Sequence, residues 1–111
     1  MRLIRVESGE LIDTLAARAA EMGITNGAIV SLIGSVDSFR ISTMPADDAT
    51  TDIITTCGQP AEMTGTGEIV DGKPHIHAVM AVEGNKAVCG HLHAAYVGTW
   101  FANVYIAPLG D

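Results

Sequence analysis

The chain has 111 residues, of which 48% are hydrophobic and 17% are charged. This length and composition predict one globular domain over residues 1–111, and they exclude a multi-domain enzyme and a disordered chain. Thirteen acidic residues against six basic ones give a formal net charge of −7, and the basic residues are dispersed along the sequence. Long-range repulsion therefore disfavours direct binding to duplex DNA or to an anionic membrane surface.

The sequence shows neither the pattern of a membrane span nor that of a secretory signal. Its longest apolar stretch, residues 28–36, falls far short of the roughly 18 residues that cross a bilayer. Glu7 and Glu10 interrupt the amino end, where a signal needs a continuous apolar core. We therefore expect a cytoplasmic protein whose two cysteines, Cys57 and Cys89, are reduced and serve as small core residues.

The first predicted element is an amphipathic helix over residues 9–22. Ser8 is a suitable N-cap for it. Gly23 provides a left-handed stop, and Ile24 follows to make the apolar contact that accompanies such a cap. The apolar face of this helix consists of residues that recur at a spacing of three to four: Leu11, Ile12, Leu15, Ala16, Ala19 and Met22.

From residue 27 onward, β-branched and apolar runs punctuated by glycine predict strands. The first of these strands are expected at residues 28–33, 39–42 and 52–57, with a surface loop at residues 44–51. A meander follows, with strands at residues 65–70, 75–82, 87–97 and 100–106 and turns at residues 71–74 and 83–86. The predicted fold class is therefore α+β, mostly an antiparallel β-sheet with one main N-terminal helix.

One helix cannot cover both faces of such a sheet. Apolar residues are left over near the carboxyl end of the chain, namely Trp100, Phe101, Val104 and Tyr105. A concentration of surplus apolar surface is typical of an interface between protein chains. We therefore expect a homo-oligomer in which another copy of the chain supplies the missing cover.

All four histidines lie on two neighbouring predicted strands, as a His75-Ile76-His77 and a His91-Leu92-His93 triplet. Because strand side chains alternate, each pair of histidines projects from one face of its strand. A three-residue turn around Gly84 would place His77 opposite His91 and His75 opposite His93. The other face of the hairpin would then be wholly apolar, which favours this register.

Imidazoles on a shared face suit a divalent metal ion. Three neutral imidazoles with an open fourth position form a common catalytic zinc site, and zinc is therefore the first expectation, although copper, iron and nickel also accept such ligands. Without a metal, four neighbouring imidazoles would repel one another once protonated. The alternative is that the histidines are exposed or are hydrogen-bonded residues of the sheet.

Other polar residues leave more than one interpretation open. Glu68 is either a carboxylate that supports the metal site or a solvated strand residue. Cys89 shares the predicted histidine face, but its apolar neighbours favour a buried structural thiol over a ligand. Asp37 and Arg40 are either functional or charges that protect a sheet edge from aggregation. The short Gly65-Thr66-Gly67 segment lacks a following helix and does not predict a phosphate loop.

The chain resembles the PPC domain family, the plants and prokaryotes conserved domain, over essentially its whole length. The motifs that carry this resemblance occur in order: residues 5–10 ahead of the helix, Ile33-Gly34-Ser35-Val36, Gly65-Thr66-Gly67, Pro74-His75-Ile76-His77 and Gly90-His91-Leu92. The resemblance implies an α+β fold, a homotrimer and a histidine cluster able to hold a metal. The family's histidine motifs correspond here to His75, His77 and His91, whereas His93 has no counterpart.

Two functions follow as expectations. The first is an oligomeric zinc-binding domain with its histidine site near a pocket for a small ligand; the sequence specifies neither the ligand nor any catalysed reaction. The second is a regulatory module associated with DNA, because stand-alone prokaryotic members of the family are often described in this way. The chain has no Arg-Gly-Arg core of an AT-hook, so such a role would act through partner assembly. A third alternative is a purely structural trimer.

Overall fold

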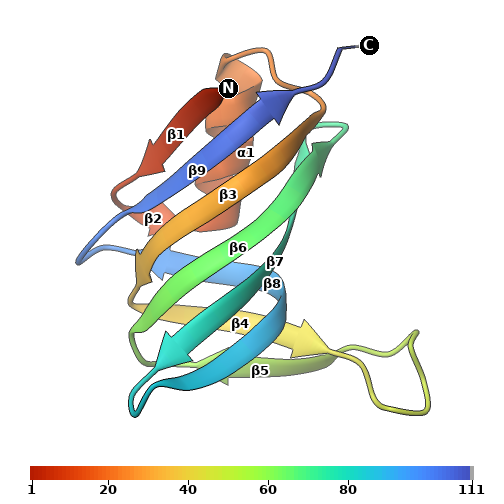
Figure 1. Cartoon of the computed structure of the whole chain (residues 1–111), viewed down its shortest axis with the longest axis vertical. Coiled ribbons are helices and arrows are strands. Elements are labelled where there is room, and N and C mark those ends of the chain that lie inside the picture. Colours follow the sequence, from red (N-terminus) through yellow and green to blue (C-terminus); the bar gives the residue numbers. More distant parts are fainter. Residues whose placement is uncertain (111) are drawn as a thin grey trace.

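The computed structural model describes residues 1–110, which form nine strands and one α-helix (Figure 1). In chain order the elements are β1 (Arg2–Val6), β2 (Gly9–Glu10), α1 (Leu11–Glu21), β3 (Gly27–Val36), β4 (Ser38–Thr43), β5 (Ile53–Cys57), β6 (Ala61–Val70), β7 (Lys73–Val82), β8 (Lys86–Val97) and β9 (Ala102–Pro108). Within residues 1–110, no helix is long and apolar enough to cross a membrane.

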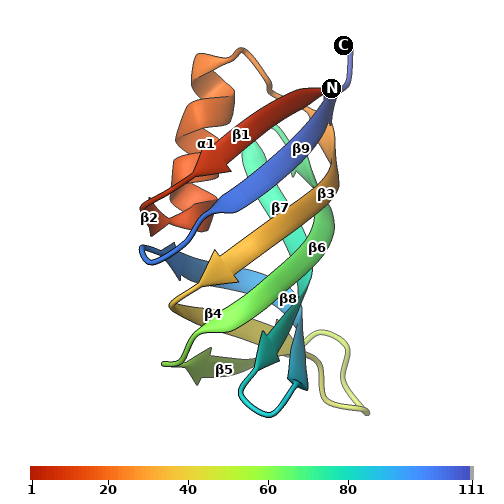
Figure 2. The ribbon, with the colours of Figure 1, turned by 60° about the vertical axis from the view of Figure 1, so that its left-hand side comes forward.

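All strands join one antiparallel sheet in the order β1-β9-β3-β6-β7-β8-β4-β5, and the short β2 pairs with β8. This arrangement confirms the predicted fold class. The helix lies at one end of the long axis and the β4–β5 arm at the other (Figures 1 and 2). β7 and β8 are central in the strand order, so side chains of β6 lie next to those of β7 and side chains of β4 lie next to those of β8.

The helix begins later than the sequence predicted, and Ser8 is not its cap. Gly9 and Glu10 are extended and pair with β8, so the first helical residue is Leu11. The Glu10 carboxylate is the N-cap, and it accepts hydrogen bonds from the backbone N–H groups of Ile12 and Asp13, each at 2.9 Å. The same carboxylate accepts from the N–H of Ala95 in β8 at 3.0 Å. A longer side chain than serine thus caps the helix and ties it to the sheet.

The end of the helix agrees with the prediction. Gly23 has φ +73°, and its N–H donates to the carbonyl of Ala20 at 3.0 Å. The N–H of Ile24 donates to the carbonyl of Ala19 at 2.9 Å. These two bonds form a Schellman motif, and Ile24 is buried beside it.

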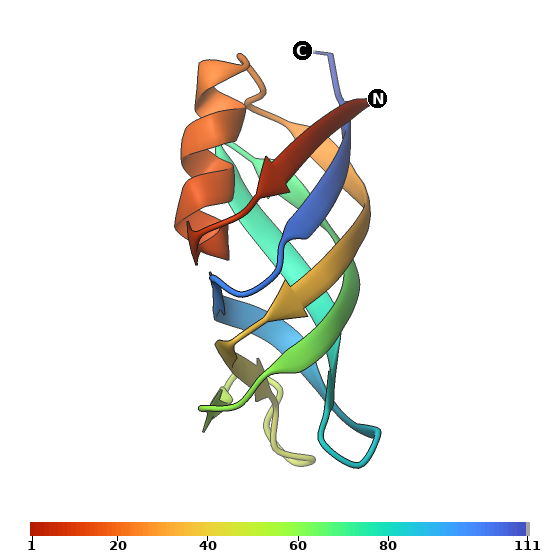
Figure 3. The ribbon, with the colours of Figure 1, turned by 90° about the vertical axis from the view of Figure 1, so that its left-hand side faces the viewer.

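The core lies between the helix and one face of the curved sheet. Leu11, Leu15 and Ala19 of α1 are fully buried against apolar residues that alternate along the strands, such as Ile76 and Met80 of β7. Within the described residues, Figure 3 shows α1 on one side of the sheet and no further helix or strand on the other. The sheet therefore has one packed face and one bare outer face.

The apolar residues near the carboxyl end divide between these faces. Val104 is fully buried in the core, so its assignment to a leftover surface was wrong. Phe101 and Tyr105 are half-buried, and the guanidinium of Arg5 lies 3.8 Å from the centre of the Phe101 ring. Trp100 remains 63% exposed. Part of the predicted surplus is thus covered within the chain, and part stays on the surface.

Two strands were missed by the sequence analysis. β1 contains two arginines among three apolar residues without a regular alternation, and only its pairing with β9, almost one hundred residues away, defines it as a strand. The two-residue β2 is likewise defined by β8. The strand predicted to begin at residue 65 begins at Ala61, because residues 61–65 pair with β3 and residues 62–70 pair with β7.

Candidate metal centre

The β7–β8 hairpin has the predicted register. Val82 pairs with Lys86 across a three-residue turn in which Gly84 and Asn85 have φ of +82° and +60°. The same register brings His77 opposite His91. The face that carries Ile76, Ala78, Met80 and Leu92 is buried. The predicted apolar face therefore packs in the core, and the histidines are directed to the bare outer face.

Three of the histidines converge on a common point. The ring centres of His75 and His77 are 4.9 Å apart, those of His75 and His91 are 5.0 Å apart, and those of His77 and His91 are 5.8 Å apart. One nitrogen from each ring lies within 4.8 Å of the others. His75 and His77 are exposed, whereas His91 is half-buried. This group contains the three residues implied by the family resemblance.

His93 takes a different position from the predicted one. The β7–β8 ladder ends at the pair His77 and His91, so the predicted pairing of His75 with His93 is not formed. A register shift between β8 and β4 makes His93 an extra residue in β8. Its Nε2 forms a hydrogen bond of 2.7 Å with Oγ of Ser42 in β4. His93 therefore stays beside His91, with ring centres 4.7 Å apart, but outside the three-histidine group.

Glu68 is a partner of the cluster. It lies opposite His75 in the β6–β7 ladder, and its Oε2 is 3.1 Å from His75 Nδ1. A carboxylate can only accept, so this contact assigns the ring hydrogen to Nδ1 and leaves Nε2 with a free lone pair. A metal-binding histidine commonly has such a carboxylate on its second nitrogen. Glu68 is also partly solvated, with its side chain 54% exposed.

The remaining candidates lie outside the cluster. Cys89 is an exposed free thiol, so the prediction of a buried structural residue was wrong; it points to the bare outer face, opposite Val79. Cys57 is free and half-buried. Asp37 accepts a hydrogen bond from the N–H of Thr99 at 3.1 Å and thus orders the turn between β8 and β9.

Glycines beside the histidines permit close approach of the neighbouring backbone. A Cβ on Gly67 of β6 would lie 2.1 Å from the carbonyl oxygen of His75, and one on Gly65 would lie 2.6 Å from that of His77. Gly90 precedes His91, has φ +150°, and its Cβ would lie 2.2 Å from the carbonyl oxygen of Ser42. Side chains at these positions would displace β7 and β8, and with them the imidazoles.

The environment of His91 favours its neutral, metal-binding form. Burial is the main cause that lowers the pKa of this imidazole from its ordinary value of 6.5. The neighbouring His93, His75 and His77 lower it further, because a second positive charge in the cluster is unfavourable. The carboxylate of Asp52 acts in the opposite direction. Protons therefore compete less with a metal ion for the ring nitrogen of such a histidine.

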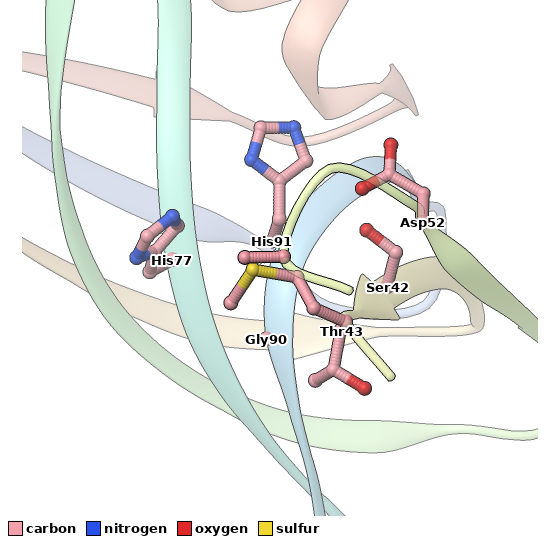
Figure 4. A pocket seen from close by; sticks show the side chains of 8 residues that line it. Ser42, Thr43, Asp52, His77, Gly90 and His91 are labelled. Atoms are coloured by element: carbon pink, nitrogen blue, oxygen red, sulfur yellow. The ribbon is translucent and has the colours of Figure 1, made fainter. Parts of the chain in front are cut away.

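A cavity of about 440 Å³ adjoins the cluster (Figure 4). Asp52, from the segment that follows β4, lies across from His77, with His91 between them in the view of Figure 4. The cavity is lined by residues of β4, β7, β8 and the β4–β5 connection: Ser42, Thr43, Met44, Ala49, Asp52, His77, Gly90 and His91. The histidines therefore have an adjacent space that a small ligand can occupy.

A family profile described as the Plants and Prokaryotes Conserved domain matches residues 2–109. The chain belongs to this family. A metal-containing protein from Archaeoglobus fulgidus is 26% identical, with a TM-score of 0.80, over 99% of this chain and 80% of that one. A plant- and prokaryote-conserved protein from Pyrococcus horikoshii is 22% identical, with a TM-score of 0.83, over 99% and 79% of the two chains.

A candidate DNA-binding protein from Ralstonia eutropha has the same fold. It is 22% identical, with a TM-score of 0.78, over 98% of this chain and 78% of that one. The comparison with proteins of curated function finds no match.

Sequence reasoning missed the polar wall of this PPC domain's cavity. Asp52 was expected only as the first residue of a strand, and Ser42 as an ordinary strand residue. Neither residue belongs to a recognisable motif. Their proximity to the histidines arises from the pairing of β4 with β8, which no local pattern predicts. The His-x-His spacing was the only local signal for the site.

The lowered pKa of His91 predicts a pH-dependent stability of the metal-free protein. In the unfolded chain His91 binds a proton as the pH falls through 6.5, whereas folded His91 stays neutral to a lower pH. The contribution of His91 to the free energy of unfolding is therefore fully present above pH 6.5, the pKa in the unfolded chain. It is lost as the pH falls from there through the lower pKa of the folded state. Urea unfolding between about pH 7.5 and about pH 5 should show a steeper loss for the natural protein than for His91→Gln. Parallel pH profiles for the two proteins would contradict this account.

Proposed function

We propose that this PPC domain binds a divalent metal, zinc in the first instance, through His75, His77 and His91, next to a pocket for a small ligand. The observation that carries the proposal is the convergence of three imidazole nitrogens within 4.8 Å. Two nitrogens bound to one tetrahedral zinc are about 3.3 Å apart, given zinc–nitrogen distances near 2.05 Å. Small side-chain rotations are enough to reach that separation.

The chemistry of the donor set supports this assignment. All three ligands are imidazoles, which suit zinc and neighbouring transition metals better than calcium or magnesium. The Glu68 contact leaves Nε2 of His75 with the lone pair that a metal needs, and the lowered pKa of His91 favours the neutral form of that ring. A three-histidine site leaves a coordination position for water or a ligand donor, and bound zinc makes such a water more acidic. The Archaeoglobus relative, described as metal-containing, is consistent with this function.

The proposal includes a homotrimer that covers part of the bare outer face. Exposed apolar residues on this face include Ile33 of β3, which is 56% exposed, and Val79 of β7, which is 43% exposed. Trp100 lies beside Ile33 in one surface hollow. Contact between copies would remove this apolar surface from water, which the chain's own helix cannot do because it packs on the other face.

A second candidate function is a regulatory module associated with DNA. Structural relatives from Ralstonia eutropha and Bacteroides thetaiotaomicron are described as candidate DNA-binding proteins. The net charge of −7 opposes a direct phosphate contact surface, so this function would act through partner proteins. A shift in the mobility of duplex DNA by the pure protein at low ionic strength would favour direct binding instead.

Removal of single histidines tests the metal site. The natural protein should hold about one zinc per chain. His77→Ala and His91→Ala should each abolish tight zinc binding, because each leaves only two of the three imidazole ligands. His93→Ala is the matched control, since His93 is on the same strand but outside the three-histidine group. Metal content would be measured by elemental analysis of tag-free protein after dialysis. Equal zinc in all four proteins, or none in the natural protein, would refute the site.

Glu68 provides a second test. Glu68→Gln removes the negative charge that orients and polarises His75, and zinc affinity should fall by about tenfold. Glu62→Gln is the control, because Glu62 is on the same strand and accepts a hydrogen bond of 2.7 Å from Ser35 without contact to a histidine. Affinities would be measured by competition with a chelating dye. An equal effect of both substitutions would show that general surface charge, and not the His75 contact, sets the affinity.

The oligomer is tested by a charge on the outer face. Ile33→Asp places a carboxylate among exposed apolar residues and should dissociate the trimer to monomers while the fold is retained. Ile54→Asp is the control, because Ile54 is 47% exposed on the edge strand β5, away from the Ile33 surface. Light scattering would give the mass and circular dichroism the fold. A monomeric natural protein, or dissociation by Ile54→Asp alone, would contradict this interface.

A further inference from the structure

We infer that the pocket takes a small amino carboxylate, with its carboxylate at the histidine site and its ammonium group at Asp52. The inference deepens the proposed function and rests on it, because the bound metal would receive the carboxylate. It concerns a residue of this chain that lies outside the histidine cluster. The argument depends on the distribution of charge and apolar surface around the cavity.

The two ends of the cavity have opposite electrostatic character. Among residues 1–110, Asp52 is the only acidic residue that lines it, and no lysine or arginine of this part of the chain lines it. The histidine side of the cavity would carry the positive charge of a bound metal. Figure 4 shows Asp52 across the pocket from His77, with His91 between them in this view. A ligand with a single negative group would satisfy the metal and leave Asp52 without a partner.

Asp52 is placed to contact a ligand bound beside the histidines, because it lines the same cavity as His77 and His91. Asp52 has an exposed side chain, and within residues 1–110 its carboxylate makes no hydrogen bond or ion pair. It is therefore free to accept hydrogen bonds from an ammonium group of a ligand.

Between these ends the wall is partly apolar. Met44 and Ala49 contribute side chains to the lining, while the Ser42 hydroxyl is already bonded to His93. A short methylene chain fits a wall of this kind better than a polyhydroxylated one, which would need more free polar partners. The cavity of about 440 Å³ suits a molecule of this small size.

The connection that carries Asp52 is held in a defined shape. The Asp48 carboxylate accepts hydrogen bonds from the N–H and hydroxyl of Thr50, at 2.9 and 2.6 Å, and from the hydroxyl of Thr51 at 2.6 Å. These bonds lower the pKa of Asp48 to about 2, so the carboxylate is ionised at neutral pH and the bonds persist. Ala49 lies within this turn, and Asp52 directly follows it. The turn thus presents both residues to the pocket.

The test compares ligands that differ only in the ammonium group. Butanoate and 4-aminobutanoate would be titrated calorimetrically into zinc-loaded full-length protein that has been dialysed free of excess zinc, together with the three-carbon and five-carbon homologues. The amino and carboxylate groups are separated in these molecules, so chelation of one metal by both is disfavoured. We expect the best amino carboxylate to bind about fivefold tighter than its unsubstituted analogue, which is the upper end of what an exposed ion pair contributes.

Asp52→Asn should remove this preference and leave butanoate binding and zinc content unchanged. Asp47→Asn is the matched control, because Asp47 is an exposed acid of the same connection and does not line the pocket. If zinc is bound but the amino group gives no advantage, or if Asp47→Asn removes the advantage equally, the inference is wrong and the metal site stands. If the natural protein binds no zinc, the proposed function fails and this inference fails with it.

Discussion

The positions of His77 and His91 on the outer face depend on one strand register, that of the β7–β8 hairpin. Side chains alternate along a strand, so a slip of one residue would bring His77 and His91 to the core and expose Ile76 and Leu92. Such a slip would expose large apolar side chains and bury imidazoles without partners. The hydrophobic effect that packs α1 on the inner face therefore also fixes the histidines on the outer face.

The same hairpin was the part of the fold most open to prediction from sequence. A hairpin face without polar side chains and a three-residue turn at Gly84 determine its register locally, so the pairing of His77 with His91 was predicted and is confirmed. The helix end at Gly23 was also predicted, because a Schellman motif depends on a few consecutive residues. Local patterns of this kind need no knowledge of the remaining chain.

What could not be predicted depends on contacts between distant segments. The edge strand β1 exists only through its pairing with β9. The extra residue His93 is set by the shifted pairing of β8 with β4, which brings its ring to Ser42. The cap of the helix is Glu10 because that carboxylate also reaches the backbone of Ala95. In each case the local structure is determined by a contact between two segments more than fifty positions apart. A sequence pattern within either segment alone does not predict it.

The bare outer face links metal binding to assembly. Ile33, Thr64, Val79 and Cys89 form one row of paired residues across this face, and Thr66, His77, His91 and Ser42 form the next. Neighbouring rows of one face are about 7 Å apart, because two residues along a strand separate them. A copy of the chain that covers the first row would therefore approach the second. If its contacts alter the site's affinity for metal, metal must alter the affinity between copies by the same factor, since the two equilibria share one thermodynamic cycle.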